Sequence, residues 1–85
     1  MKLIYSSRFT KSYKKLVKGN KQLEDKIIKT ITTFQTSSTH LSLRLHKLKK
    51  YEYWSLSVNM TIRIIFEYNQ NSVLLIDIGD HSIYD

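Results

Sequence analysis

The stretch from Val73 to Ile78 reads VLLIDI, an almost continuous apolar run that ends at Gly79. A strand of this composition is buried on both faces, so we expect it at the centre of a sheet. The segment before it, NQN at 69–71, predicts a turn, and TIRIIFEY at 61–68 predicts the strand that enters the turn. These two strands decide the fold, because the rest of the sheet has to be built around them.

Upstream of them, apolar and polar residues alternate from Tyr53 to Val58, which is typical of a strand with one buried face. Asn59-Met60 then predicts a turn into the strand at 61–68. Leu41 to Leu48 predicts one more strand, which would lead into a basic loop. Because short turns join these strands, we expect the sheet to be mostly antiparallel.

The N-terminal half predicts one short strand followed by two amphipathic helices. Lys2–Ser6 is the strand, Ser6 or Ser7 is placed to cap the first helix, and Gly19 ends that helix. Asn20 is placed to cap the second helix. Apolar residues recur at helical spacing at Phe9, Tyr13 and Leu16, and then at Leu23, Ile27, Ile28, Ile31 and Phe34. We assign every Ile and Leu of the strands and helices named so far to the core.

The order of elements predicts one α+β domain over residues 1–85. It would be a small, twisted, mostly antiparallel sheet with an N-terminal strand and a helical hairpin packed on one face. The chain has no cysteine, which excludes disulfides, thiolate metal sites and a cysteine nucleophile. His40, His46 and His81 lack the spacing of a metal motif, and we expect neither a metal nor another cofactor. No apolar run is long enough to cross a membrane.

Positive charge is concentrated in the first part of the chain. The net charge is +7, and thirteen of the fourteen Lys and Arg residues precede residue 51, whereas five of the seven acidic residues follow it. Such an imbalance indicates a polyphosphate or an acidic protein as partner. The stretch RLHKLKKYEYW at 44–54 has four cations beside three aromatic residues. We expect it to bind RNA or, alternatively, to dock an acidic protein, through Arg44, Lys47, Lys49 and Lys50.

Arg63 does not fit a core strand, since it is a lone cation between Ile62 and Ile64. Two interpretations stay open on pattern alone. One is a structural ion pair with Asp77 or Glu67. The other is a guanidinium group aimed at a phosphate, two oxygens of which its planar fork can bind.

His81 follows the strand at 73–78 just beyond Gly79, a position suited to a surface cleft. There it could transfer a proton near neutral pH, with Asp80 or Asp77 fixing its tautomer, or it is a solvated histidine of the tail. Tyr84 is either an anchor of the terminal segment or a platform on which a base stacks.

Taken together, these residues resemble the RelE/ParE superfamily of bacterial toxins, which act in toxin–antitoxin systems. The resemblance covers nearly the whole chain. It is carried by FTKSYKK at 9–15 and by three elements in fixed order, YWS at 53–55, RIIF at 63–66 and GDH at 79–81. The superfamily fold is a small sheet packed on a helical hairpin, which the periodicity predicts independently.

The resemblance to the RelE/YoeB/YafQ-like branch implies an endoribonuclease that cuts mRNA on the ribosome without a metal. In that reaction the ribose 2′-hydroxyl attacks the adjacent phosphate and leaves a 2′,3′-cyclic phosphate and a free 5′-hydroxyl. The chemistry requires a base, an acid and cations at the phosphorus.

Carried over by position, Arg63 corresponds to the phosphate-stabilising arginine of the superfamily. His81 corresponds to its C-terminal acid or base, with His46 as a second proton carrier. Tyr84 falls near an aromatic residue that orients or stacks on the nucleotide. The basic segment that assists charge stabilisation and proton transfer corresponds to Lys47 and Lys49.

The sequence also departs from the superfamily pattern. Ser57 and Thr61 stand where some members have a second histidine and an aspartate, and Tyr84 is one residue closer to His81 than is common. The general base therefore stays open among His46, Lys47, Lys49 and His81.

Three functions follow as hypotheses. The leading one is a toxin of the bacterial cytoplasm that cleaves mRNA and is neutralised by an antitoxin with an acidic or hydrophobic segment. Promoter DNA would then be bound only through the complex with the antitoxin. The alternatives are a ParE-like inhibitor of DNA gyrase, against which the two histidines argue, and a RelE-fold binding module without activity.

Overall fold

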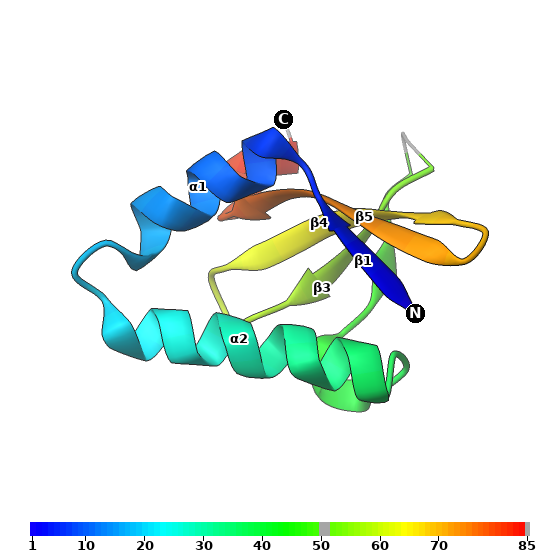
Figure 1. Ribbon diagram of the computed structural model, residues 1–85, viewed down its shortest axis with the longest axis horizontal. Coiled ribbons are helices and arrows are strands. Elements are labelled where there is room, and N and C mark those ends of the chain that lie inside the picture. The colour runs from blue at the N-terminus through cyan, green and yellow to red at the C-terminus, as the bar shows by residue number, and fades with distance from the viewer. Residues whose placement is uncertain (50–51, 85) are drawn as a thin grey trace.

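Five strands form one sheet in the order β1-β5-β4-β3-β2 (Figure 1). Their bounds are Lys2–Tyr5 for β1, His46–Lys47 for β2, Trp54–Ser57 for β3, Arg63–Asn69 for β4 and Ser72–Gly79 for β5. β1 pairs with β5 in parallel, and the other neighbours are antiparallel. The computed structural model describes residues 1–49 and 52–84, without the side chains of His81 and Tyr84.

The predicted α+β class is confirmed. The apolar strand at 73–78, expected at the centre of the sheet, is an internal strand, but the middle position of the five belongs to β4. β5 has a hydrogen-bonded neighbour on each side, β1 and β4. Val73, Leu75 and Ile78 of β5 are all buried. The C-terminal strand is therefore the one on which the rest of the sheet is assembled, as its composition predicts.

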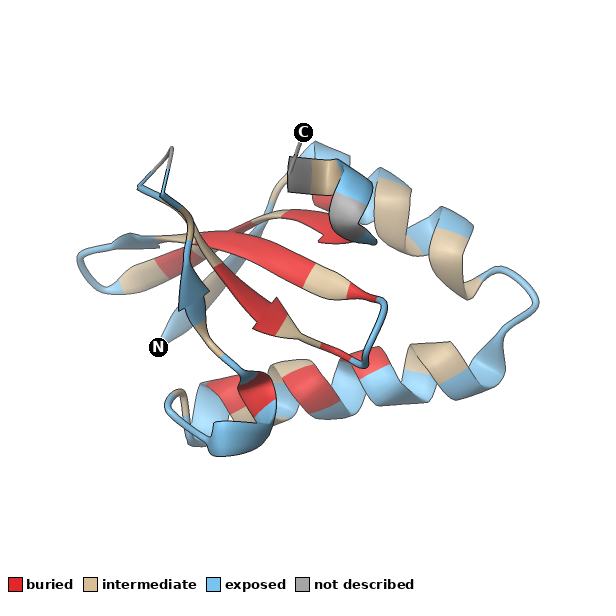
Figure 2. Ribbon diagram, turned by 180° about the vertical axis from the view of Figure 1, so that it is seen from behind, coloured by how far each residue is buried: buried red, intermediate tan, exposed pale blue. Residues whose placement is uncertain are grey.

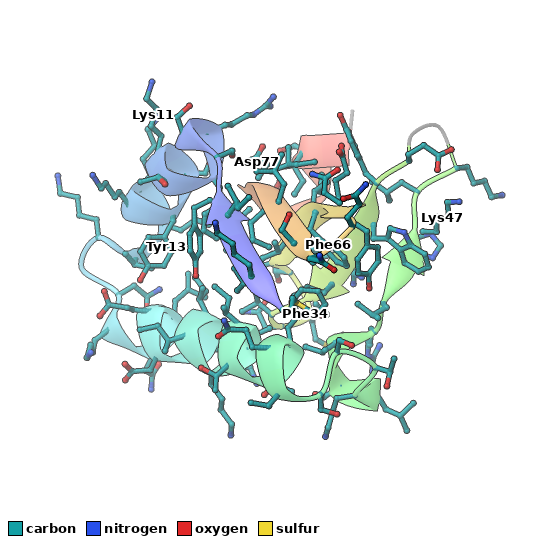
Figure 3. All side chains as sticks on the ribbon, turned by 45° about the vertical axis from the view of Figure 1, so that its right-hand side comes forward. Lys11, Tyr13, Phe34, Lys47, Phe66 and Asp77 are labelled. Atoms are coloured by element: carbon teal, nitrogen blue, oxygen red, sulfur yellow. The ribbon has the colours of Figure 1, made fainter. Side chains whose placement is uncertain are left out.

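Two helices, α1 at Ser7–Val17 and α2 at Lys21–Thr36, flank the sheet. They form an open V with the sheet between its arms (Figure 1). α1 follows β1 directly and packs against β5. α2 packs on the sheet through Phe34, whose ring centroid lies 4.9 Å from that of Phe66 on β4 (Figure 3).

The helix ends lie where the capping residues predict them. Ser6 Oγ accepts a hydrogen bond from the Phe9 backbone N–H at 2.9 Å, and Asn20 Oδ1 accepts one from Leu23 N–H at 3.1 Å. Each cap satisfies a backbone donor that the first helical turn cannot pair. Gly19 separates the helices with a φ of 69°, a left-handed conformation that glycine adopts without a Cβ clash.

The hydrophobic core lies between α2 and the strands, whose buried stretches face the buried side of that helix (Figure 2). Its fully buried aromatic and aliphatic members include Phe34, Phe66, Ile27, Leu43, Leu56, Ile64, Leu75 and Ile78. The assignment of every Ile and Leu to this core is wrong for Ile4, Ile28 and Leu41, which are 41%, 52% and 91% exposed. Ile28 stays uncovered because it lines the open groove between the diverging helices.

The strand predicted over Leu41–Leu48 is also largely wrong. Leu41–Leu43 forms a 3-10 turn, η1, and only two residues of β2 pair with β3. Arg44 explains the difference, because its φ of 47° is left-handed and breaks the extended path. Across the part of the chain that the structure describes, no helix is both long and apolar enough to cross a bilayer.

Candidate active site

Arg63, at the start of β4, is held in a fixed orientation by its neighbours. Its Nε and one terminal nitrogen donate to Oγ of Ser55 on β3 at 3.2 and 3.0 Å, and the same terminal nitrogen donates to the Arg44 carbonyl at 2.9 Å. The left-handed backbone at Arg44 accompanies this contact. The guanidinium plane is thus oriented before any ligand arrives, which lowers the entropic cost of binding one.

No carboxylate among the described residues pairs with Arg63. Asp77, 4% exposed, is instead engaged by α1: Arg8 Nε lies 3.0 Å from Oδ2, and Ser12 Oγ donates to Oδ1 at 2.8 Å. The structural ion pair of Arg63 with Asp77 or Glu67 is therefore wrong. Arg63 has a charge that the described part of the protein leaves uncompensated.

The register of the strands brings His46 to the same face as Arg63. On β3, Ser57 pairs with Arg63 of β4. Two residues earlier on β3, Ser55 pairs with Ile65 on one side and with His46 of β2 on the other. Directly opposite residues share a face, and residues two apart on one strand do as well. His46 is exposed at the edge of this face.

The C-terminal turn folds over the same face. Gly79 lies directly opposite Arg63, and the 3-10 turn η2, His81–Tyr84, begins two residues later. A Cβ on Gly79 would lie on the Arg63 face and only 2.6 Å from Cγ2 of Ile83, so η2 packs against that face. The side chains of His81 and Tyr84 lie outside the described part of the structure, and so does Lys50. The backbone of η2 begins two residues after Gly79, the residue that pairs with Arg63.

The lysines of the basic stretch lie elsewhere. Lys47 follows His46 along β2, so its side chain points to the other face of the sheet, where it pairs with Trp54 of β3. The Lys47 side chain is labelled in Figure 3. Its Nζ lies 3.7 Å from a Glu52 carboxylate oxygen. Lys49 is exposed after the end of β2. These two lysines are thus exposed at the sheet edge, and neither lines the pocket beside Arg63.

A pocket of about 260 Å³ opens beside Arg63, at the end of the sheet where β3 turns into β4. Three cations from three separate segments line it, and none of its described lining residues is acidic. Arg44 and Arg63 are candidates from the sequence alone, whereas Lys26 of α2 is not among the predicted site residues. The polar and apolar walls of the pocket include Ser42, Ser57, Asn59 and Met60.

A second, apolar groove of about 230 Å³ lies between the arms of the V. Its walls come from both helices and the end of β1, and they include Tyr5, Phe9, Tyr13, Ile28 and Ile31. Burial here, aided by the negative charge of Glu24, raises the pKa of the Tyr13 phenol. The mainly apolar lining makes the groove a candidate for protein contact.

The described residues contain no group of three or more His, Cys, Asp or Glu side chains arranged to hold a metal ion. The pocket beside Arg63 offers cations, while His46 adds an imidazole at the edge of the Arg63 face, outside the described pocket lining. Cations and an imidazole are suited to binding a phosphodiester and catalysing its cleavage.

Solved structures with the same architecture include bacterial toxins. YafQ from Escherichia coli superposes with a TM-score of 0.80 at 16% identity, over 96% of this chain and 94% of that one. A metal-bound toxin from Helicobacter pylori gives 0.80 at 21% identity, over 100% and 99% of the two chains. The YoeB–YefM toxin–antitoxin complex from Staphylococcus aureus gives 0.76 at 18%, over 95% and 97%.

The chain therefore has the RelE/YoeB/YafQ-like toxin fold. At these identities the likeness defines the architecture and leaves the activity to be argued from the site. Neither a protein-family model nor a curated protein sequence matches the chain.

Proposed function

We propose that this protein is the toxin of a toxin–antitoxin system and acts as a metal-independent endoribonuclease on ribosome-bound mRNA in the bacterial cytoplasm. The observation that supports it most is the state of Arg63. Two hydrogen-bond acceptors, Ser55 Oγ and the Arg44 carbonyl, orient its guanidinium, and no described carboxylate neutralises it. A cation fixed in this way is suited to stabilising charge that develops on a phosphate.

In the proposed reaction the 2′-oxygen forms a bond to phosphorus while the bond from phosphorus to the 5′-oxygen breaks. A base takes the proton of the 2′-hydroxyl, and an acid gives a proton to the departing 5′-oxygen. His81 is the main proton carrier in this proposal and His46 the second, while Arg63 stabilises the pentavalent phosphorus. Tyr84 orients the nucleotide by stacking on its base.

The flanking RNA backbone is proposed to lie along the basic stretch, at Arg44, Lys47, Lys49 and Lys50. Arg44 is the member of this set that lines the pocket beside Arg63. Contacts of this kind give affinity without sequence information. The ribosome would therefore have to present the mRNA for the chain to cut at defined positions.

The proposed partner is an antitoxin, as in the YoeB–YefM complex of the S. aureus protein with the same fold. An acidic antitoxin segment would neutralise the cationic pocket, and a hydrophobic segment would cover the apolar groove with its half-exposed Ile28. In this proposal promoter DNA is bound only through the antitoxin complex.

The test is a translating bacterial extract to which the purified chain is added, with mRNA ends mapped by primer extension. We expect new 5′-hydroxyl ends within codons being decoded, and we expect Arg63→Ala and His81→Ala to abolish them. A parallel assay contains DNA gyrase and supercoiled DNA. Intact mRNA together with gyrase-dependent DNA breaks would overturn the proposal in favour of a ParE-like poison, and no effect in either assay would favour an inactive binding module.

A further inference from the structure

Lys26 stands out among the cations of the helices. It lies in the middle of α2 and lines the pocket that also contains Arg44 and Arg63. By contrast, Lys21 at the start of the same helix is neutralised by Glu24 and Asp25 at 3.2 and 3.0 Å. None of the described acidic residues pairs with Lys26. Its charge is therefore available to a ligand.

The opposite wall of the pocket is fixed by the turn between β3 and β4. Asn59 Oδ1 accepts hydrogen bonds from the backbone N–H groups of Thr61 and Ile62, at 2.8 and 2.7 Å. Because its oxygen is used in this way, Asn59 has only its amide NH2 left to offer to the pocket. The wall thus adds hydrogen-bond donors to the three cations, and an anion rich in acceptors is the complementary ligand.

Met60, which follows Asn59, favours a nucleotide over a simple anion as the ligand of the pocket. It also lines the pocket, and it is 91% exposed. An apolar, polarisable side chain beside cations suits a nucleotide, whose phosphate and base or ribose need both kinds of contact. A lone carboxylate of a protein partner would use one cation and leave the others uncompensated.

We infer that Lys26, Arg44 and the Asn59 amide form a second phosphate subsite, which binds the phosphodiester adjacent to the one held by Arg63. The inference rests on the proposed function, since it takes single-stranded RNA as the ligand. A flanking phosphate does not change its bonding during cleavage, so Lys26 contributes equally to the ground state and the transition state. Its loss raises KM and leaves kcat unchanged.

The first test measures binding without cleavage. The probe is a fluorescent single-stranded RNA heptamer with 2′-O-methyl groups at every position, which removes the attacking hydroxyl. Binding is followed by anisotropy from low to high NaCl for wild type, Lys26→Gln and Lys29→Gln. Lys29 is the matched control, because it is an exposed lysine of the same helix that does not line the pocket.

We expect Lys26→Gln to weaken binding several-fold and to reduce the slope of log K against log salt by about 0.7, the value for one phosphate contact on a single strand. Lys29→Gln should retain the wild-type slope. Equal changes in the two variants would overturn the subsite, because they would show only a diffuse effect of helix charge.

The second test compares KM and kcat in the translating extract. If wild type cleaves mRNA and the two variants have equal KM, the subsite is wrong and the proposed function stands. If wild type does not cleave mRNA but Lys26→Gln still lowers heptamer affinity and its salt slope, the subsite stands and the proposed activity fails. Weaker binding of a poly-glutamate peptide by Lys26→Gln, with unchanged heptamer binding, would overturn the RNA assignment in favour of an acidic protein ligand.

Discussion

Ser55 and Arg63, on adjacent strands, are joined by two hydrogen bonds from one guanidinium group to one hydroxyl oxygen. Ser55 is fully buried, and its hydroxyl is thus placed to orient the arginine while remaining out of contact with a ligand. The Arg44 carbonyl completes the support from the opposite side of the β3 strand. A rigid, polar support of this kind distinguishes a cation held in one orientation from an ordinary solvated cation on the surface.

Replacing Ser55 by alanine should lower activity while leaving the fold intact. Hydrogen bonds to a charged group contribute about 1.5–3 kcal/mol, so kcat should fall roughly 10- to 100-fold as the guanidinium loses its orientation. Rates of mRNA cleavage in the extract measure this. Ser72→Ala is the control, because among the described residues its hydroxyl donates only to the Asn69 carbonyl, next to the β4–β5 turn. A wild-type kcat for Ser55→Ala would contradict the role given to this hydroxyl.

Replacing Arg63 by lysine should abolish cleavage and barely change the melting temperature. Lysine retains the charge but has no planar fork with which to reach Ser55 and the Arg44 carbonyl together. Circular dichroism melts and mapping of mRNA ends give the two readouts. A sharp drop in melting temperature would instead assign Arg63 to the stability of the sheet.

Replacing Asp77 by alanine should destabilise the protein, with a loss of activity that follows from unfolding. The carboxylate is almost fully buried and accepts from Ser12 Oγ and from its neighbour Ile78 N–H, both at 2.8 Å. A buried donor left without a partner, here Ile78 N–H, costs about 1–3 kcal/mol, and the half-buried Ser12 hydroxyl costs less. Urea denaturation should show this loss. Arg8→Ala should cost much less, since the Arg8 side chain is 73% exposed; equal losses for the two variants would mean that the ion pair dominates.

Replacing Gly79 by alanine should displace η2 and reduce cleavage. The added methyl group would lie 2.6 Å from Cγ2 of Ile83, so one of the two has to move. Overpacking of this kind costs about 1–3 kcal/mol where the neighbour cannot shift. The double variant Gly79→Ala/Ile83→Ala relieves the clash and should recover cleavage relative to the single variant. If the single variant cleaves at the wild-type rate, the position of η2 is irrelevant to the reaction.

Much of the fold follows from local signals in the sequence. The hydroxyl of Ser6 and the amide of Asn20 mark the two helix starts, and the apolar run of β5 marks an internal strand. These signals work because capping and burial depend on neighbours that are close in sequence. The left-handed residue Arg44 shows the limit, since nothing in the residue type indicates a φ of 47°.

The candidate site is less accessible from sequence, because its parts come from distant segments. Arg63 is visible as a cation among isoleucines, whereas Lys26 has the same appearance as any solvated lysine on a helix. Only the packing of α2 near the β3–β4 turn brings it to the pocket. Likewise, the partner of Asp77 is Arg8, 69 positions away, and no periodicity connects the two.

The pairing of β1 with β5 also has a consequence for biosynthesis. Lys2 lies opposite Ser72, so the first strand made by the ribosome has no hydrogen-bonded neighbour until the last strand has been released from it. Contacts of such large sequence separation slow folding. The nascent chain would thus complete its sheet only after synthesis has passed Gly79, so the native fold would form after translation rather than during it.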